Sequence, residues 1–100
     1  MNGLHEKYYI LQNSIEAFVT HLGTERDRAE NALRELGPLT GKDFKEHLES
    51  NYFLQIEAFA KQLRSGQITD EGLRRLLGNL WALFKSVSVT RDRLLKGEEQ

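Results

Sequence analysis

Apolar side chains recur in alternating steps of four and three residues over three long stretches of the chain, the pattern of amphipathic helices that pack along a seam. The first stretch runs from Gly3 to Leu36. Its seam positions are Leu4, Tyr8, Leu11, Ile15, Phe18, Leu22, Glu25, Ala29, Ala32 and Leu36. All but Glu25 are apolar. An unbroken helix over this stretch would be about 51 Å long.

The continuity of this first helix is open at Gly23-Thr24. Glycine can end a helix, and Thr24 with Asp27 three residues later has the spacing of a capping box. The seven-residue spacing nevertheless stays in phase across Gly23, whereas an inserted loop normally shifts it. We therefore expect one long first helix, with a kink at Gly23 or a break into two shorter helices as the alternative.

Two further helices follow. The second is predicted from about Lys42 to Ser65, because Thr40 and Asp43 are spaced as a capping box before it. The third begins after the N-cap residue Thr69 and extends to about residue 96. Its seam positions are Leu73, Leu77, Leu80, Phe84, Val87, Arg91 and Leu94, with Leu76 and Leu83 in a second apolar row.

The loops between these helices are short. Gly37-Pro38 ends the first helix, and Gly66 follows the second. Because loops of about three to six residues connect neighbours in space, consecutive helices must be antiparallel. The expected fold is all-α: an up-down-up antiparallel three-helix bundle with a long first helix, in a single helical domain over residues 1–100.

Composition narrows the classes of function. With 14 basic and 15 acidic side chains, the formal net charge is −1, so the whole chain has no electrostatic attraction to nucleic acid or anionic lipid. The absence of cysteine excludes disulfides, thiolate metal sites and cysteine nucleophiles. The start lacks the pattern of a signal peptide, and no apolar run approaches about 18 residues. We therefore expect a cytoplasmic protein without a membrane partner.

The chain carries no recognisable catalytic or metal-binding constellation. A carboxylate-bridged metal site in a bundle needs Glu-x-x-His pairs, and none of His5, His21 and His47 has a glutamate three residues before it. There is no Gly-x-Ser-x-Gly motif and no glycine-rich phosphate loop. We expect no metal, no cofactor and no enzymatic activity.

The predicted helix lengths leave the start of the first helix without a neighbour. The second helix would be about 24 residues or ~36 Å long, so its far end would reach only the level of Asn13. Residues 3–12 would then project by roughly 15 Å, and exposed apolar side chains there would form an interaction site. The candidate partner-binding residues are Leu4, Tyr8, Tyr9, Ile10 and Leu11. A break at Gly23 would remove the projection, because the first half would pack back as a fourth helix.

The sequence favours a non-enzymatic protein-interaction module, such as an adaptor, a small chaperone or an assembly subunit. A homodimer paired through the N-terminal part of the first helix is the simplest arrangement that covers the projection. The alternative is a nucleic-acid-associated subunit. It depends on Arg64, Arg74 and Arg75, which a helical hairpin could bring together as a phosphate-contacting patch.

Overall fold

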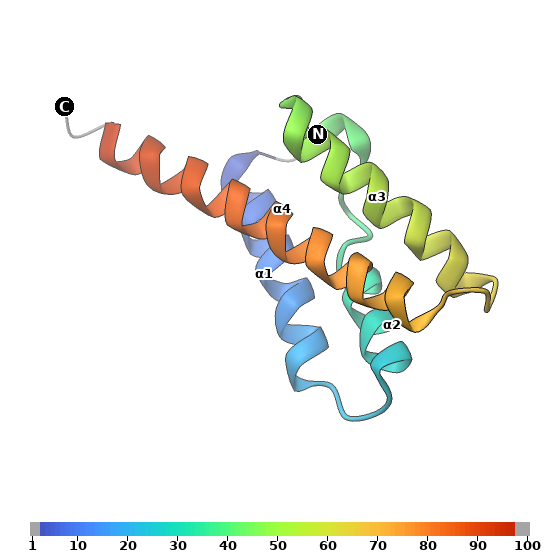
Figure 1. Cartoon of the computed structure of the whole chain (residues 1–100). Helices are drawn as coiled ribbons and strands as arrows, with labels where there is room; N and C mark the ends of the chain where they lie inside the picture. Colours follow the sequence, from blue (N-terminus) through green and yellow to red (C-terminus); the bar gives the residue numbers. More distant parts are fainter. Residues whose placement is uncertain (1–2, 98–100) are drawn as a thin grey trace.

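The computed structural model describes residues 3–97 and is all-helical over that range (Figure 1), which confirms the predicted fold class. The elements are α1 (Leu4–Thr20), α2 (Glu25–Glu35), the short 3₁₀ helix η1 (Gly41–Asp43), α3 (His47–Arg64) and α4 (Asp70–Gly97). None of the helices within residues 3–97 has the length and apolar character needed to cross a membrane.

The prediction of one continuous helix over residues 3–36 is wrong, because the chain breaks at Gly23. Gly23 has a φ of 138°, a conformation that residues with a side chain rarely adopt. Thr24 then caps α2: the Asp27 amide donates to Thr24 Oγ1 at 3.1 Å, and the Thr24 amide donates to Asp27 Oδ2 at 3.2 Å. This reciprocal capping box satisfies two amides at the start of α2. The described chain therefore forms four α-helices, and the three-helix topology is not observed.

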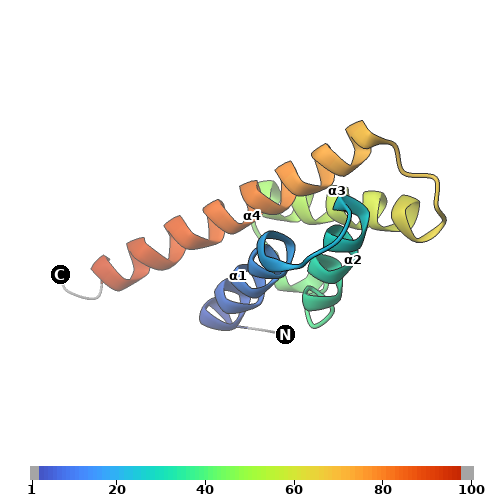
Figure 2. The ribbon, with the colours of Figure 1, turned by 90° about the horizontal axis from the view of Figure 1, so that it is seen from below.

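α1 and α2 form an antiparallel hairpin (Figures 1 and 2). The buried Ser14 hydroxyl on α1 donates to the Ala32 carbonyl on α2 at 2.7 Å, so the two backbones approach closely. Arg28 Nε donates to the Phe18 carbonyl at 2.7 Å, and its guanidinium lies 4.6 Å from the centre of the Phe18 ring. Arg28 thus satisfies a carbonyl that has no partner within the last turn of α1.

The start of α3 lies five residues later than predicted. The capping box at Thr40 does form, since the Thr40 amide donates to Asp43 Oδ2 at 2.8 Å, but it caps η1. The chain then extends through Phe44 before α3 begins at His47. α3 is consequently 18 residues long.

α4 begins where the sequence predicts. The Gly72 amide donates to Thr69 Oγ1 at 2.9 Å, which confirms Thr69 as the capping residue. Asp70 and Glu71 lie in the first turn, where the helix macrodipole favours negative charge. α4 has 28 residues, which is about 42 Å at 1.5 Å per residue.

The core lies where α4 meets α1, α2 and α3. On α4 the buried side chains are Leu73, Leu76, Leu80, Leu83 and Val87. Leu76 and Leu83, predicted as a second apolar row, are more deeply buried than the predicted seam residues Leu77 and Phe84, which remain partly exposed. The buried positions end at Val87. Beyond Val87, α4 still contacts the start of α1 at Arg91, and its last turns extend past the other helices, as Figures 1 and 2 show.

A first prediction tests the core face of α4. Leu80 is buried, so Leu80→Ala should lower the free energy of unfolding by about 2–5 kcal/mol through lost burial and the cavity left behind. Leu54→Ala on α3, whose leucine is exposed, is the matched control and should cost less than ~1 kcal/mol. Chemical denaturation measures both, and equal losses would show that the core face is misassigned.

A second prediction tests the turn that separates α1 from α2. Gly23→Ala should destabilise the protein by about 1–3 kcal/mol, because the backbone conformation is strained for alanine. The new Cβ would also lie 3.0 Å from Asp27 Oδ2, an atom of the capping box. Gly78→Ala, in the middle of α4 with no other atom within 4 Å of the added Cβ, should instead stabilise by roughly 0.5–1 kcal/mol. Thermal unfolding of the two variants should therefore shift in opposite directions, and a neutral Gly23→Ala would contradict the strained turn.

Candidate functional site

The start of α1 is attached to the C-terminal part of α4 by an arginine that lies on aromatic rings. The Arg91 guanidinium lies 4.4 Å from the centre of the Tyr8 ring and 5.8 Å from that of Tyr9. Arg91 Nε also donates to His5 Nδ1 at 3.2 Å. Tyr8 also packs against Phe84 of α4, with ring centres 5.4 Å apart. These contacts hold the first turns of α1 against α4.

A second contact attaches the same part of α1 to the segment before α3. Lys7 Nζ donates to the Asp43 carbonyl at 2.8 Å and lies 5.4 Å from the centre of the Phe44 ring. Residues near the start of α1 therefore contact both α4 and η1. The predicted projection of residues 3–12 is absent.

The five predicted partner-binding residues accordingly have different surroundings. Leu4, Tyr8 and Ile10 are half-buried against the core, and Tyr9 is exposed. Leu11 is fully buried within the chain. These residues do not project because the chain breaks at Gly23, and α1 folds back onto the bundle as a fourth helix. Any surface that these residues offer to a partner is limited to Tyr9 and the outer edges of its neighbours.

Residues 88–97 of α4 are here called the α4 end. Arg91 within it contacts α1, and the last turns project past the other helices. An apolar groove of about 550 Å³ lies between it and the start of α1. Leu4, Thr90, Arg93, Leu94 and Gly97 line this groove. Leu94 and Leu95 have exposed fractions of 48% and 39%. Exposed apolar side chains beside a groove are typical of an interaction site.

The sequence contains the apolar pattern of the α4 end, although the sequence analysis predicted that residues 3–12 of the first helix would project. Leu94 continues the apolar seam of α4 about two turns beyond Val87. An apolar position on the seam is covered only where another helix runs beside it. Because α3 begins at His47 rather than near residue 42, no part of α3 extends along the α4 end.

The three predicted phosphate-contacting arginines are all exposed, but Arg64 and Arg75 line separate depressions. Arg75 lies beside Phe59 of α3 and pairs with Glu71 on its own helix at 3.0 Å. Arg74 lines neither depression.

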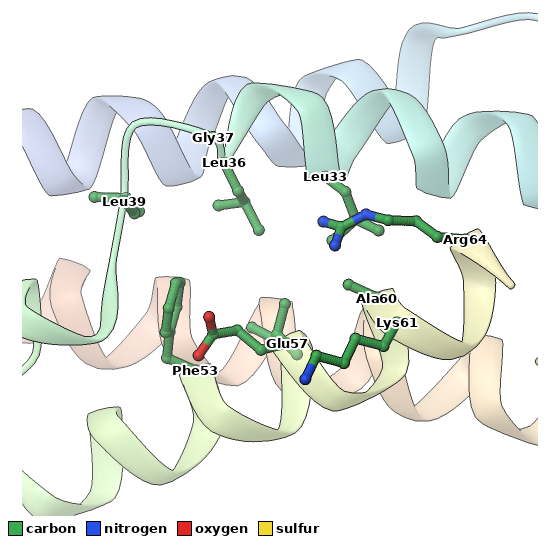
Figure 3. A pocket seen from close by; sticks show the side chains of 10 residues that line it. Leu33, Leu36, Gly37, Leu39, Phe53, Glu57, Ala60, Lys61 and Arg64 are labelled. Carbon is green, nitrogen blue, oxygen red and sulfur yellow. The ribbon is translucent and has the colours of Figure 1, made fainter.

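Arg64 belongs instead to a depression between α2 and α3, here called the α2–α3 pocket, of about 180 Å³. Its apolar surface is formed by Leu33, Leu36, Leu39, Phe53, Ile56 and Ala60. Three charged side chains of α3, Glu57, Lys61 and Arg64, line the same pocket (Figure 3). Figure 3 shows the Arg64 side chain extending from α3 toward Leu33 on α2.

Buried polar groups elsewhere are satisfied within the chain. Glu49 lies in the first turn of α3, where the macrodipole stabilises a carboxylate, and it accepts a hydrogen bond from Ser86 Oγ at 2.7 Å. Within residues 3–97, no three histidine, aspartate or glutamate side chains converge as metal ligands would.

Comparisons of the chain with models of protein families, with curated proteins and with solved structures found no match. Its candidate sites are therefore identified by residues and geometry: the α4 end with its groove, and the α2–α3 pocket.

Proposed function

We propose that the protein is a non-enzymatic interaction module that self-associates through the α4 end and its groove. One observation carries this proposal: the apolar seam of α4 continues past its buried positions, so that Leu94 is exposed in the groove beside Leu4, with the exposed Leu95 next to it in the chain. A helix that keeps its apolar stripe beyond its neighbours gains stability when another helix covers the stripe.

A second copy of the chain is the occupant that the geometry favours. Each copy supplies a projecting helix with two leucines and, next to it, a groove lined by Leu4 and Leu94. Two copies related by a two-fold axis would place the α4 end of each in the groove of the other. Such an isologous pairing uses one surface twice and closes without leaving an uncovered copy.

The expected stability of the dimer follows from the apolar surface of the α4 end that a second copy could bury. Covering the exposed half of one leucine side chain is worth roughly 1 kcal/mol, so four leucines in a dimer contribute roughly 4 kcal/mol. This is close to the lower estimates of the freedom lost on association. The four leucines therefore only offset the lowest cost of association, and a dimer measurable by sedimentation must also bury the groove lining and the edges of Leu4 and Tyr9. The proposal predicts a weak dimer that forms only as the concentration rises.

The nucleic-acid alternative has less support. Arg75 is paired with Glu71, and Arg64 lies in the separate α2–α3 pocket. An apolar dimer contact changes little with salt, whereas phosphate contacts weaken steeply as salt rises. The salt dependence of any complex therefore separates the two functions.

A third prediction tests self-association. In sedimentation equilibrium the parent chain should shift from monomer to dimer as concentration rises. The double variant Leu94→Glu/Leu95→Glu should remain monomeric, because dimer formation would then bury four carboxylates. It should still unfold cooperatively, since both leucines lie outside the core.

The control is Leu48→Glu/Leu54→Glu on α3, where the exposed fractions are 49% and 58%. It introduces the same charge at leucines that are at least as exposed as Leu94 and Leu95, and it should dimerise like the parent. A parent chain that stays monomeric at its highest soluble concentration would contradict the proposal. Equal loss of dimer in both double variants would also contradict it, because the contact would then not be specific to the α4 end.

A further inference from the structure

The α2–α3 pocket has the size of a small organic ligand. Its volume of about 180 Å³ slightly exceeds that of an engineered cavity of ~150 Å³ that binds benzene. Leu33 on α2 and Leu36, which directly follows α2, line the pocket together with Phe53, Ile56 and Ala60 on α3, and most of these side chains belong to the core. The floor is therefore fixed by packing.

The cations at the pocket have no partner among the described residues. Lys61 and Arg64 lie in the last turn of α3, where the macrodipole favours positive charge. Within residues 3–97, however, neither side chain makes an ion pair or a hydrogen bond. Their donors are free to bind an anion while the apolar floor binds a hydrocarbon group.

We propose that the α2–α3 pocket binds a small monocarboxylate whose apolar body is about the size of a benzene ring. The ring fits the floor between Leu36 and Ile56. Arg64 binds the carboxylate, because its planar guanidinium matches the two oxygens with two parallel hydrogen bonds. Lys61, one turn earlier on α3, adds a second positive charge.

Glu57 sets a further property of the ligand. In Figure 3 its carboxylate lies toward Phe53, on the side of the pocket away from the Arg64 guanidinium. A ligand with a second carboxylate at the far end of its ring would place like charges together there. Like charges at short range repel most where little water separates them. The site therefore selects a monocarboxylate over a dicarboxylate of similar shape.

The fourth prediction uses phenylacetate as the probe, followed by amide chemical shifts in a titration of the full chain. Phenylacetate should bind saturably with a dissociation constant on the order of 1 mM, as expected for about ten non-hydrogen atoms. The shifts should concentrate at Leu33, Ile56 and Ala60. The neutral analogue 2-phenylethanol and the dicarboxylate para-phenylenediacetate should each bind more weakly by about tenfold.

The matched variants are Arg64→Met and Arg74→Met. Both remove one positive charge and keep most of the aliphatic stem, but only Arg64 lines the pocket. Arg64→Met should weaken phenylacetate by about tenfold without changing 2-phenylethanol, and Arg74→Met should change neither. Because Arg64 is exposed, its variant should keep the parent's thermal unfolding. Lys61→Met provides a second test, with a smaller loss of affinity for phenylacetate.

Several results would overturn the proposal. These are the absence of saturable shifts at the pocket, equal affinity for the acid and the alcohol, or equal affinity of Arg64→Met and the parent chain. The Leu94→Glu/Leu95→Glu variant should bind phenylacetate as the parent does, since the α4 end does not line the pocket. Failure of the pocket and failure of self-association are therefore separate results.

Discussion

The turn at Gly23-Thr24 is the constraint on which the arrangement of the helices depends. Gly23 adopts a positive φ, and the capping box of Thr24 and Asp27 restarts the helix in the opposite direction. α1 can then place Leu11 in the core and bond Ser14 to α2. The same reversal brings the start of α1 against α4, where Arg91 lies on the Tyr8 ring. A continuous helix would have left this region of α4 without a neighbour.

Much of the fold follows from the sequence, and the missed break has a physical explanation. The apolar rhythm predicts the helical content, the cap at Thr69 and the extent of α4. The apolar seam also stays in phase across Gly23. It does so because the connection between α1 and α2, residues 21–24, has about as many residues as one helical turn. A connection of that length preserves the phase even though the chain reverses. The two seam positions nearest the turn show the difference: Glu25 is charged, and Leu22 is 91% exposed.

The candidate sites were harder to predict than the helices, because each depends on where a neighbouring helix ends. Leu94 lies on a predictable seam, but its exposure follows from the late start of α3 at His47 and from the position of α1. Arg64 was predicted to join Arg74 and Arg75 in one patch, since all three lie near the α3–α4 turn in sequence. In the structure Arg64 extends toward α2 instead. That direction depends on the packing of α2 against α3, which helical periodicity alone does not specify.

Both candidate sites arise from unequal helix lengths, and their side chains determine what each can bind. α2 has 11 residues against 18 in α3, and the pocket beside α3 is lined beyond the end of α2 by Leu36, Gly37 and Leu39. α4 has 28 residues, and its end meets another helix only at the start of α1, through Arg91 and Leu4, so that Leu94 stays exposed. The pocket is small and carries two cations, Lys61 and Arg64, that have no partner among residues 3–97, which suits a compact anion with an apolar body. The α4 end is long and presents leucines on a helix, which suits another helix, because only an extended apolar surface covers such a stripe along its length.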